Sequence, residues 1–313
     1  MQRVKQGTVC CLAGDAPSEV RLRSSQPRTR LRRIASASQT ATRRANGRIL
    51  HTMEARNLDS AIDAVLLPYL PRERIKLCYA QSPGNELRAK FISAQSSASL
   101  VANAFGFYLE KPALLEGLPG GPVLTVDLEK SLRFPWSGGR HPYLDVVITG
   151  SETLVGIESK RYEPFRGHTV AEISEAYRRP VWGAEMSGYE AIRDRLYVNP
   201  RAYRYLDAGQ LIKHALGLRT AVNRQPPGIH HGKRPVLVYL YAEPTAWPDQ
   251  RAIPRETHAE HVAEIESFAN TVAGNEVEFH SMTYRALLKC WSASRSQDVQ
   301  SHAQALSERY PLL

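Results

Sequence analysis

The chain has 313 residues, of which 42% are hydrophobic and 23% charged, so we expect a globular protein with a sizeable core and exclude a fibrous or wholly disordered chain. The net charge of +10 would indicate a nucleic-acid partner, but residues 1–52 alone carry eleven Lys and Arg against two acidic residues. The remainder is nearly neutral, so any phosphate-binding surface on it must be a local patch. We expect no membrane-spanning segment, because no apolar run reaches about 18 residues.

The N-terminal segment, residues 1–52, is rich in Arg, Ser, Thr and Ala without helical or strand periodicity, and we expect it to be disordered. Three interpretations stay open: a basic arm that binds phosphates, an organelle transit peptide, or a stretch that precedes a true start at Met53. Residues 53–313 then form a single domain. The four cysteines show neither metal-ligand spacing nor a disulfide framework. This pattern favours a reducing compartment, and we therefore expect a cytoplasmic protein.

The first half of the domain predicts helices followed by strands. The longest helical pattern runs from Pro83 to Tyr108, with Ser82 as its N-cap and an apolar residue at every third or fourth position. A shorter helix is expected over 58–70, before a proline-bearing loop. Strands are expected over 123–128, 143–149 and 153–160.

The second half alternates helices and strands. The apolar run from Pro235 to Tyr241 is typical of a buried central strand. The other expected elements are helical pieces near 170–177 and 189–195, helices over 203–218 and 256–273, a strand over 277–281, and a terminal helix through Leu287 and Trp291. The order of the elements predicts one α/β domain with a mixed sheet.

The two strands over 143–149 and 153–160 form a predicted β-hairpin that carries charged residues at its open end. A turn centred between residues 151 and 152 sets Asp145 opposite Glu158, with Lys160 on the same face of its strand. Two like charges that face each other destabilise a strand pair unless a cation lies between them. The pattern therefore predicts a divalent metal site, and the alternative is a solvated hairpin end bridged by Lys160.

This constellation resembles the PD-(D/E)XK nuclease superfamily, with matching positions at Pro142, Asp145, Glu158 and Lys160. The proline stands three residues before the aspartate rather than next to it. The resemblance covers residues 83–240, or 83–282 if the last helix and strand belong to the core. It implies an α/β fold with a restriction-endonuclease-like core, in which helices flank a central mixed β-sheet in the order α-β-β-β-α-β.

Shorter motifs further resemble an uncharacterised restriction-endonuclease-like family within this superfamily. They comprise the run from Asn85 to Phe91, the pair Ser96–Ser97, the run from Asn103 to Gly106, and Glu158–Ser–Lys160.

The resemblance implies a nuclease that hydrolyses phosphodiester bonds with Mg²⁺, for which Mn²⁺ could substitute. The implied substrate is nucleic acid, in the first place DNA, in a restriction or repair role. Asp145, Glu158 and the backbone carbonyl of Ser159 would bind the metal, and Lys160 would act on the attacking water. The alternative is an inactive nuclease-fold module that binds nucleic acid or protein, and a homodimer stays open in either case.

Four further residues are candidates around this site. The resemblance adds Glu86, in the first turn of the long helix, and Gln210 to the active site, although the helix dipole favours an acid at position 86 regardless of function. Tyr162 and Lys213 are candidate nucleic-acid contacts; the alternatives are a packed tyrosine with a solvated hydroxyl and a solvated helix face. We interpret His214, on the same stripe as Lys213, as part of that solvated face.

Overall fold

The computed structural model describes most of the chain beyond the basic N-terminal segment: residues 59–81, 91–137, 141–167 and 173–311. The chain divides into two units, residues 1–55 and 56–313, and all described residues belong to the second unit. The expectations for residues 1–52, for the Ser82 N-cap and for Glu86 lie outside the described residues.

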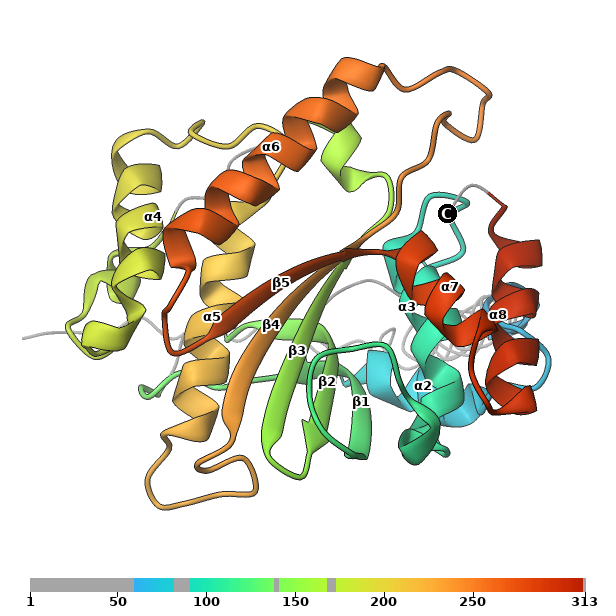
Figure 1. Ribbon diagram of the computed structural model, residues 1–313, viewed down its shortest axis with the longest axis horizontal. Helices are drawn as coiled ribbons and strands as arrows, with labels where there is room; N and C mark the ends of the chain where they lie inside the picture. Colours follow the sequence, from blue (N-terminus) through green and yellow to red (C-terminus); the bar gives the residue numbers. More distant parts are fainter. Residues whose placement is uncertain (1–58, 82–90, 138–140, 168–172, 312–313) are drawn as a thin grey trace, which may run out of the picture. The chain divides into compact units, whose positions relative to one another are not determined.

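A five-stranded mixed sheet forms the centre of the protein (Figure 1), as the sequence predicted. Its strands lie in chain order, the first three antiparallel and the last two parallel to the third. They are β1 (Val123–Ser131), β2 (Tyr143–Gly150), β3 (Thr153–Lys160), β4 (Arg234–Tyr241) and β5 (Glu278–Thr283). Every residue of β4 after Arg234 is buried, which explains its unbroken apolar run.

The predicted hairpin register is confirmed. Val146 pairs with Ile157 and Thr149 with Leu154. The ladder ends at Val146, and its register continued by one residue would set Asp145 opposite Glu158. Because β3 and β4 are parallel and pair from Thr153 to Lys160, the end of β3 that carries Glu158 is also the end at which β4 finishes.

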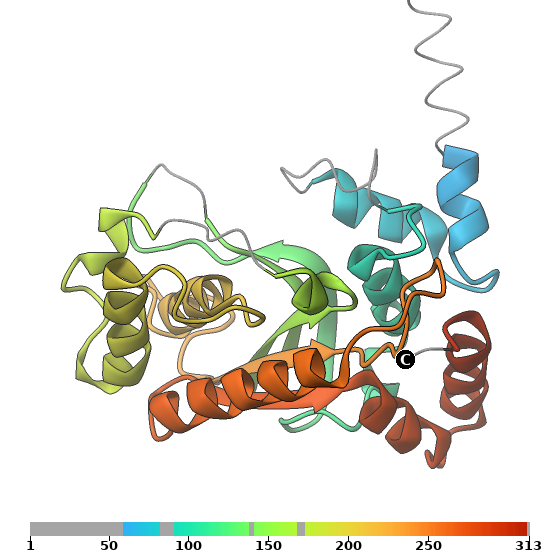
Figure 2. The ribbon, with the colours of Figure 1, turned by 90° about the horizontal axis from the view of Figure 1, so that it is seen from above.

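Helices cover both faces of the sheet, and a separate hydrophobic core lies under each group (Figures 1 and 2). One face carries α2 (Arg72–Ala80), α3 (Ser97–Phe105), α7 (Tyr284–Ser292) and α8 (Gln297–Arg309). The other carries α4 (Ser187–Val198), α5 (Ala208–Val222) and α6 (Arg255–Val272). Short 3₁₀ helices connect these elements: η2 (Gly106–Leu109), η3 (Pro112–Leu114), η4 (Glu163–Arg166), η5 (Glu175–Arg178) and η6 (Ala184–Met186).

Of the long helix expected over 83–108, the structure describes residues 91–108, and only part of these is α-helical. Residues 91–96 form turns, and α3 begins at Ser97 with the Ser96 hydroxyl accepting a hydrogen bond from the Ser99 amide at 3.1 Å. The Ser93 hydroxyl accepts from the amide of Gln95. These serines satisfy backbone groups locally and compete with the helix, so the apolar spacing that continues through them does not extend it.

Other helix boundaries also differ from the expectation. Helix α5 begins at Ala208, where the Asp207 carboxylate caps the Gln210 amide, and runs four residues past the expected end at Leu218. The first helix ends at residue 65, and α2 occupies the region expected to be a proline-bearing loop. Of the piece expected near 170–177, the described part holds only the 3₁₀ helix η5. Helix α8 was not predicted.

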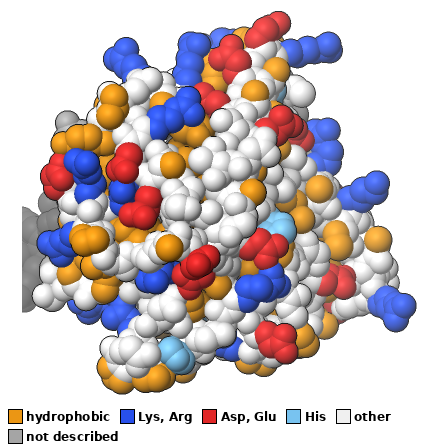
Figure 3. Space-filling view, turned by 60° about the vertical axis from the view of Figure 1, so that its left-hand side comes forward, with side chains coloured by type: hydrophobic (Ala, Val, Ile, Leu, Met, Phe, Trp, Pro, Cys, Tyr) orange, Lys and Arg blue, Asp and Glu red, His pale blue; other side chains and the backbone are white. Residues whose placement is uncertain are grey.

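Charged side chains of both signs are mixed over the face shown in Figure 3, rather than gathered in one basic field. This fits the nearly neutral composition of residues 53–313. In the part of the chain that the structure describes, no helix combines the length and apolar character that a membrane crossing requires.

Candidate active site

The predicted site residues gather where the end of β3 meets the first turns of α5. Glu158 and Lys160 are alternate residues of β3 and therefore share one face of the strand. Gln210 and His214 are one helical turn apart on α5 and face that strand. A Cβ at position 156 of β3 would collide with Leu144 and lie 3.1 Å from Leu218 of α5, so a glycine there permits this close approach.

Lys160 connects the strand to the helix. Its Nζ lies 2.5 Å from Oε1 of Glu158 and donates a hydrogen bond to Oε1 of Gln210 at 2.8 Å. The side chains of Lys160 and Glu158 are only 13% and 2% exposed, so this is a largely buried ion pair rather than a surface one. The structure thus brings Glu158, Lys160 and Gln210 together, as the sequence predicted.

His214 is the site residue that the sequence interpretation missed. It is 2% exposed, and its Nε2 lies 2.7 Å from Oε2 of Glu158, so the expectation of a solvated residue is wrong. The two atoms are within ion-pair distance but are not aligned for a hydrogen bond. Lys213 is half-buried, with Nζ 5.9 Å from the ring centre of Tyr177. The i, i+4 spacing from Gln210 was the signal that could have identified His214.

Asp145 lies beside the same stretch of β3. Its Oδ2 accepts a hydrogen bond from the Ser159 amide at 2.6 Å, which fixes the carboxyl next to the peptide that joins Glu158 to the rest of the strand. The Ser159 hydroxyl pairs with the Tyr284 hydroxyl at 2.7 Å. Asp145 remains half-buried, whereas Glu158 is buried.

A third acid lies in the same row of the sheet. In the β1–β2 ladder, Leu128 pairs with Val146 and Lys130 with Leu144, so the intervening Glu129 is opposite Asp145. Burial raises the pKa of Asp145 well above its usual range, and the negative charges of Glu158 and Glu129 raise it further.

The pKa of Glu158 moves in the opposite direction. Burial by itself would raise it, but the charge of Lys160 and the proximity of His214 lower it to about 2. Burial opposes the charged form of Lys160 as well, but the Glu158 and Asp145 carboxylates overcome that effect and raise the pKa of its ammonium group. The surroundings thus move the pKa values of the two acids in opposite directions, that of Asp145 upward and that of Glu158 downward.

The donor chemistry of these acids fits Mg²⁺. Magnesium prefers carboxylate oxygens and is commonly held by one or two carboxylates together with waters and substrate phosphates, so Asp145 and Glu158 would suffice. Over the described ranges, no group of three or more His, Cys, Asp or Glu side chains is arranged to hold a metal ion. Burial is the main cause of the raised pKa of Asp145, and a cation would offset the smaller contribution from the negative charges of Glu158 and Glu129.

Tyr162 does not have the open ring expected of a nucleotide contact. The side chain is 2% exposed, and its ring stacks on Trp247 with the ring centres 5.5 Å apart and the planes 21° from parallel. The guanidinium carbon of Arg161 lies 5.2 Å from the Tyr162 ring centre. In this structure the ring is therefore covered by protein and not available to a base.

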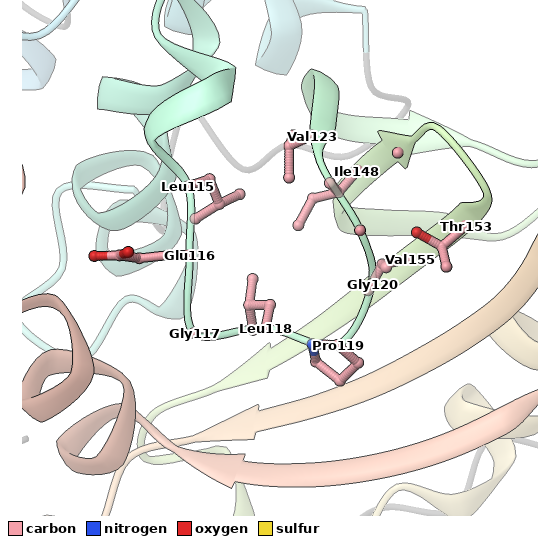
Figure 4. Close-up of a pocket in the computed structure, with 12 residues that line it drawn as sticks. Leu115, Glu116, Gly117, Leu118, Pro119, Gly120, Val123, Ile148, Thr153 and Val155 are labelled. Carbon is pink, nitrogen blue, oxygen red and sulfur yellow. The ribbon is translucent and has the colours of Figure 1, made fainter. Parts of the chain in front are cut away.

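A cavity of about 240 Å³ lies elsewhere, between the loop from Leu115 to Gly121 and strands β1–β3. Figure 4 shows the side chains of Leu118 and Ile148 between the loop and the strands, and Glu116 on the outer side of the loop. Thr153 borders the cavity and begins β3, so the cavity is at the opposite end of the hairpin from Asp145 and Glu158. It is separate from the candidate active site.

No family model, curated protein or solved structure matches this chain. The fold and site define an α/β protein in which helices flank a five-stranded mixed sheet and a buried Glu–Lys–Gln–His cluster lies beside an aspartate. Its function has to be argued from this cluster.

Proposed function

We propose that the protein is a Mg²⁺-dependent nuclease of the PD-(D/E)XK type that hydrolyses phosphodiester bonds of DNA. The observation that carries the proposal is the joining of Glu158, Lys160 and Gln210 in one largely buried cluster beside Asp145. Helix α4 stands between β3 and α5; apart from it, the element order α3, β1, β2, β3, α5, β4 is the α-β-β-β-α-β order that the resemblance implies, and this supports the proposal.

Each residue of the cluster has a chemical role in this mechanism. Asp145 and Glu158, with the carbonyl of Ser159, would hold Mg²⁺, which when bound supplies a polarised water and offsets the charge of the scissile phosphate. The water oxygen forms a bond to phosphorus, the bond from phosphorus to the leaving sugar oxygen breaks, and that oxygen takes up a proton. The Lys160 ammonium positions the attacking water and stabilises the negative charge that develops.

Gln210 and His214 act through their neighbours. The Gln210 amide oxygen accepts from Lys160 and so fixes the direction of the ammonium group. His214 lies against the second oxygen of Glu158, opposite the one that Lys160 contacts, and so holds the carboxylate in place. Both are positioning residues.

The test is cleavage of a labelled DNA duplex, in Mg²⁺ and in EDTA, by the full chain and by two variants. We expect Asp145→Asn and Lys160→Met to lower the rate by at least about 100-fold. Lys76→Met is the matched control, since the Lys76 side chain is 12% exposed and lies 2.7 and 2.8 Å from Asp59 and Asp63. Cleavage that persists in EDTA or in Asp145→Asn would refute the proposal.

One observation favours an alternative, a nuclease-fold module without catalysis. Both oxygens of Glu158 already lie against protein cations or a histidine, so the cluster could be a closed structural network. Thermal melting separates the two functions, because an ion that binds only the native state must raise the midpoint. A midpoint that rises with Mg²⁺ in the natural protein but not in Asp145→Asn supports the nuclease, and no shift in either supports the module.

A further inference from the structure

The chain segments that follow β3 and β4 bring two aromatic rings together next to the candidate active site. Both strands end at the same edge of the sheet, where the Ala242 amide donates a hydrogen bond to the Lys160 carbonyl at 2.9 Å. Two residues beyond Lys160, the Tyr162 ring stacks on Trp247 from the β4 side. In open α/β sheets, ligands bind outside the carboxyl ends of the parallel strands, which is where this pair lies.

A tight turn holds Trp247 over Tyr162. The Trp247 amide donates to the Arg251 carbonyl at 2.8 Å, and the Ile253 amide donates to the Thr245 carbonyl at 2.9 Å. Within this turn, Gln250 has a φ of 66°, a conformation that non-glycine residues adopt only where the surrounding structure imposes it. The backbone of Arg251 is therefore held next to that of Trp247.

Three arginines surround the two stacked rings, and we call them the arginine cluster: Arg161, Arg166 and Arg251. The guanidinium carbons of Arg166 and Arg251 lie 5.4 and 5.5 Å from the Trp247 ring centre. Arg161 lies 5.2 Å from the ring centre of Tyr162, and its Nη1 donates to the Ala94 carbonyl at 2.7 Å. Stacking on a ring restrains a guanidinium without using its remaining N–H donors.

The acids that lie near this cluster are held by backbone amides rather than by its guanidinium groups. Among the residues that the structure describes, no carboxylate forms an ion pair with any of the three guanidinium groups. The Glu163 carboxylate accepts from the backbone amides of Arg161 and Tyr162, and the Asp249 carboxylate accepts from the backbone amide of Arg251. Both acids are thus engaged by amides, and the guanidinium groups keep donors for another anion.

We propose that the arginine cluster binds the phosphodiester backbone of DNA next to the scissile phosphate, an inference that rests on the proposed function. The planar fork of a guanidinium matches two phosphate oxygens, which makes arginine suited to this contact. Base stacking does not fit, because Tyr162 is 2% and Trp247 9% exposed. A local patch of this kind is what the nearly neutral remainder of the chain requires for phosphate binding.

The test is binding of a fluorescein-labelled DNA duplex by the full chain in EDTA, measured by anisotropy at several salt concentrations. We compare Arg166→Gln/Arg251→Gln with Arg179→Gln/Arg195→Gln. The control pair also stacks on rings, with Arg179 4.8 Å from Trp136 and Arg195 5.4 Å from Tyr203, and removes the same charge. All four arginines are exposed, and thermal melts check that each variant is folded.

We expect the cluster variant to bind at least about tenfold more weakly, and the slope of log K against log salt to fall by about 1.8, since each lost phosphate contact removes about 0.9. The control variant should keep most of the affinity. Equal losses in both variants, or no loss in the cluster variant, would overturn the inference.

The outcome is independent of cleavage, because the measurement is made in EDTA. If the cluster variant binds DNA more weakly but the natural protein never cleaves DNA, the proposed phosphate-binding role of the arginine cluster stands and only the proposed nuclease activity is refuted. If the natural protein cleaves DNA but the cluster variant binds DNA with normal affinity, only the proposed phosphate-binding role of the arginine cluster is refuted.

Discussion

His214 Nε2 lies 2.7 Å from Glu158 Oε2, and both side chains are only 2% exposed. A second His–Glu pair on β5 has nearly the same separation, 2.6 Å between His280 Nε2 and Glu278 Oε1, but its side chains are 39% and 43% exposed. The chain thus places a histidine and a glutamate at nearly the same separation in two environments, one buried and one partly exposed. A buried carboxylate that loses a partner has no water to replace it, whereas an exposed one does.

We therefore predict that His214→Leu lowers the free energy of unfolding by about 1–3 kcal/mol, because among the described side chains Glu158 would keep only Lys160 as an ion-pair partner. The matched change His280→Leu should cost no more than about 1 kcal/mol. Urea unfolding at pH 7 measures both. Equal costs would mean that His214 does not stabilise the buried carboxylate.

A second prediction concerns the direction of the Lys160 ammonium group. Gln210→Ala removes the amide oxygen that accepts from Nζ at 2.8 Å, so the ammonium can rotate away from the attacking water. If the protein is a nuclease, kcat should fall by about 10- to 100-fold with KM nearly unchanged.

Gln300→Ala is the control for this change. Gln300 is half-buried like Gln210 and makes one hydrogen bond of 2.7 Å, to the Ser294 carbonyl, but lies on α8. An equal fall in kcat in both variants would assign the effect to general loss of structure.

The hairpin and its register could be predicted from the sequence because they depend on local features. The two apolar runs and the turn-like residues around Ser151 fix which residue of β2 faces which residue of β3, and the observed ladder from Val146 to Thr149 has the predicted register. The buried strand β4 was predictable for the same reason: its apolar run is itself the signal.

Two of the errors, those at His214 and Tyr162, arose where distant packing decides the structure. Whether His214 meets solvent or β3 depends on how α5 packs against the sheet and α4, which the sequence of α5 alone does not show. Tyr162 is covered by Trp247, a residue that lies 85 positions further along the chain. The start of α3 depends on a local competition in which serine caps replace an otherwise continuous helical pattern.

The close approach of α5 to the sheet gives a third prediction. Gly156→Ala would place a methyl group against Leu144 and within 3.1 Å of Leu218, so we expect a loss of about 1–3 kcal/mol in the free energy of unfolding. Gly228→Ala, where no atom lies within 4 Å of the added carbon, should be neutral or slightly stabilising. Chemical denaturation of both variants measures the difference, and a neutral Gly156→Ala would show that α5 can move away without cost.

The last prediction is a pH dependence of stability that originates at His302, on α8. Its Nε2 lies 2.9 Å from the Ala104 carbonyl, its Nδ1 lies 2.8 Å from the Tyr69 hydroxyl, and its ring stacks on Phe107 with the centres 4.6 Å apart. A neutral ring with a proton on Nε2 satisfies both contacts. Burial lowers the pKa of His302 to about 4, and the hydrogen bond to Ala104 opposes this only in part.

Because the pKa of His302 is lower in the folded protein, the unfolded chain binds a proton more readily between the two values. Stability contributed by the neutral ring is therefore complete above about pH 6.5 and decreases as the pH falls toward 4, by about 3 kcal/mol in total.

Other groups titrate in the same range, so the measurement is the difference between the natural chain and His302→Gln in urea unfolding from pH 8 to pH 4. Glutamine offers a donor and an acceptor but does not titrate, so the variant should lose less stability on acidification than the natural chain. Parallel stability curves for the two proteins would mean that His302 has the same proton affinity in both states, which its burial under Phe107 and Ala104 argues against.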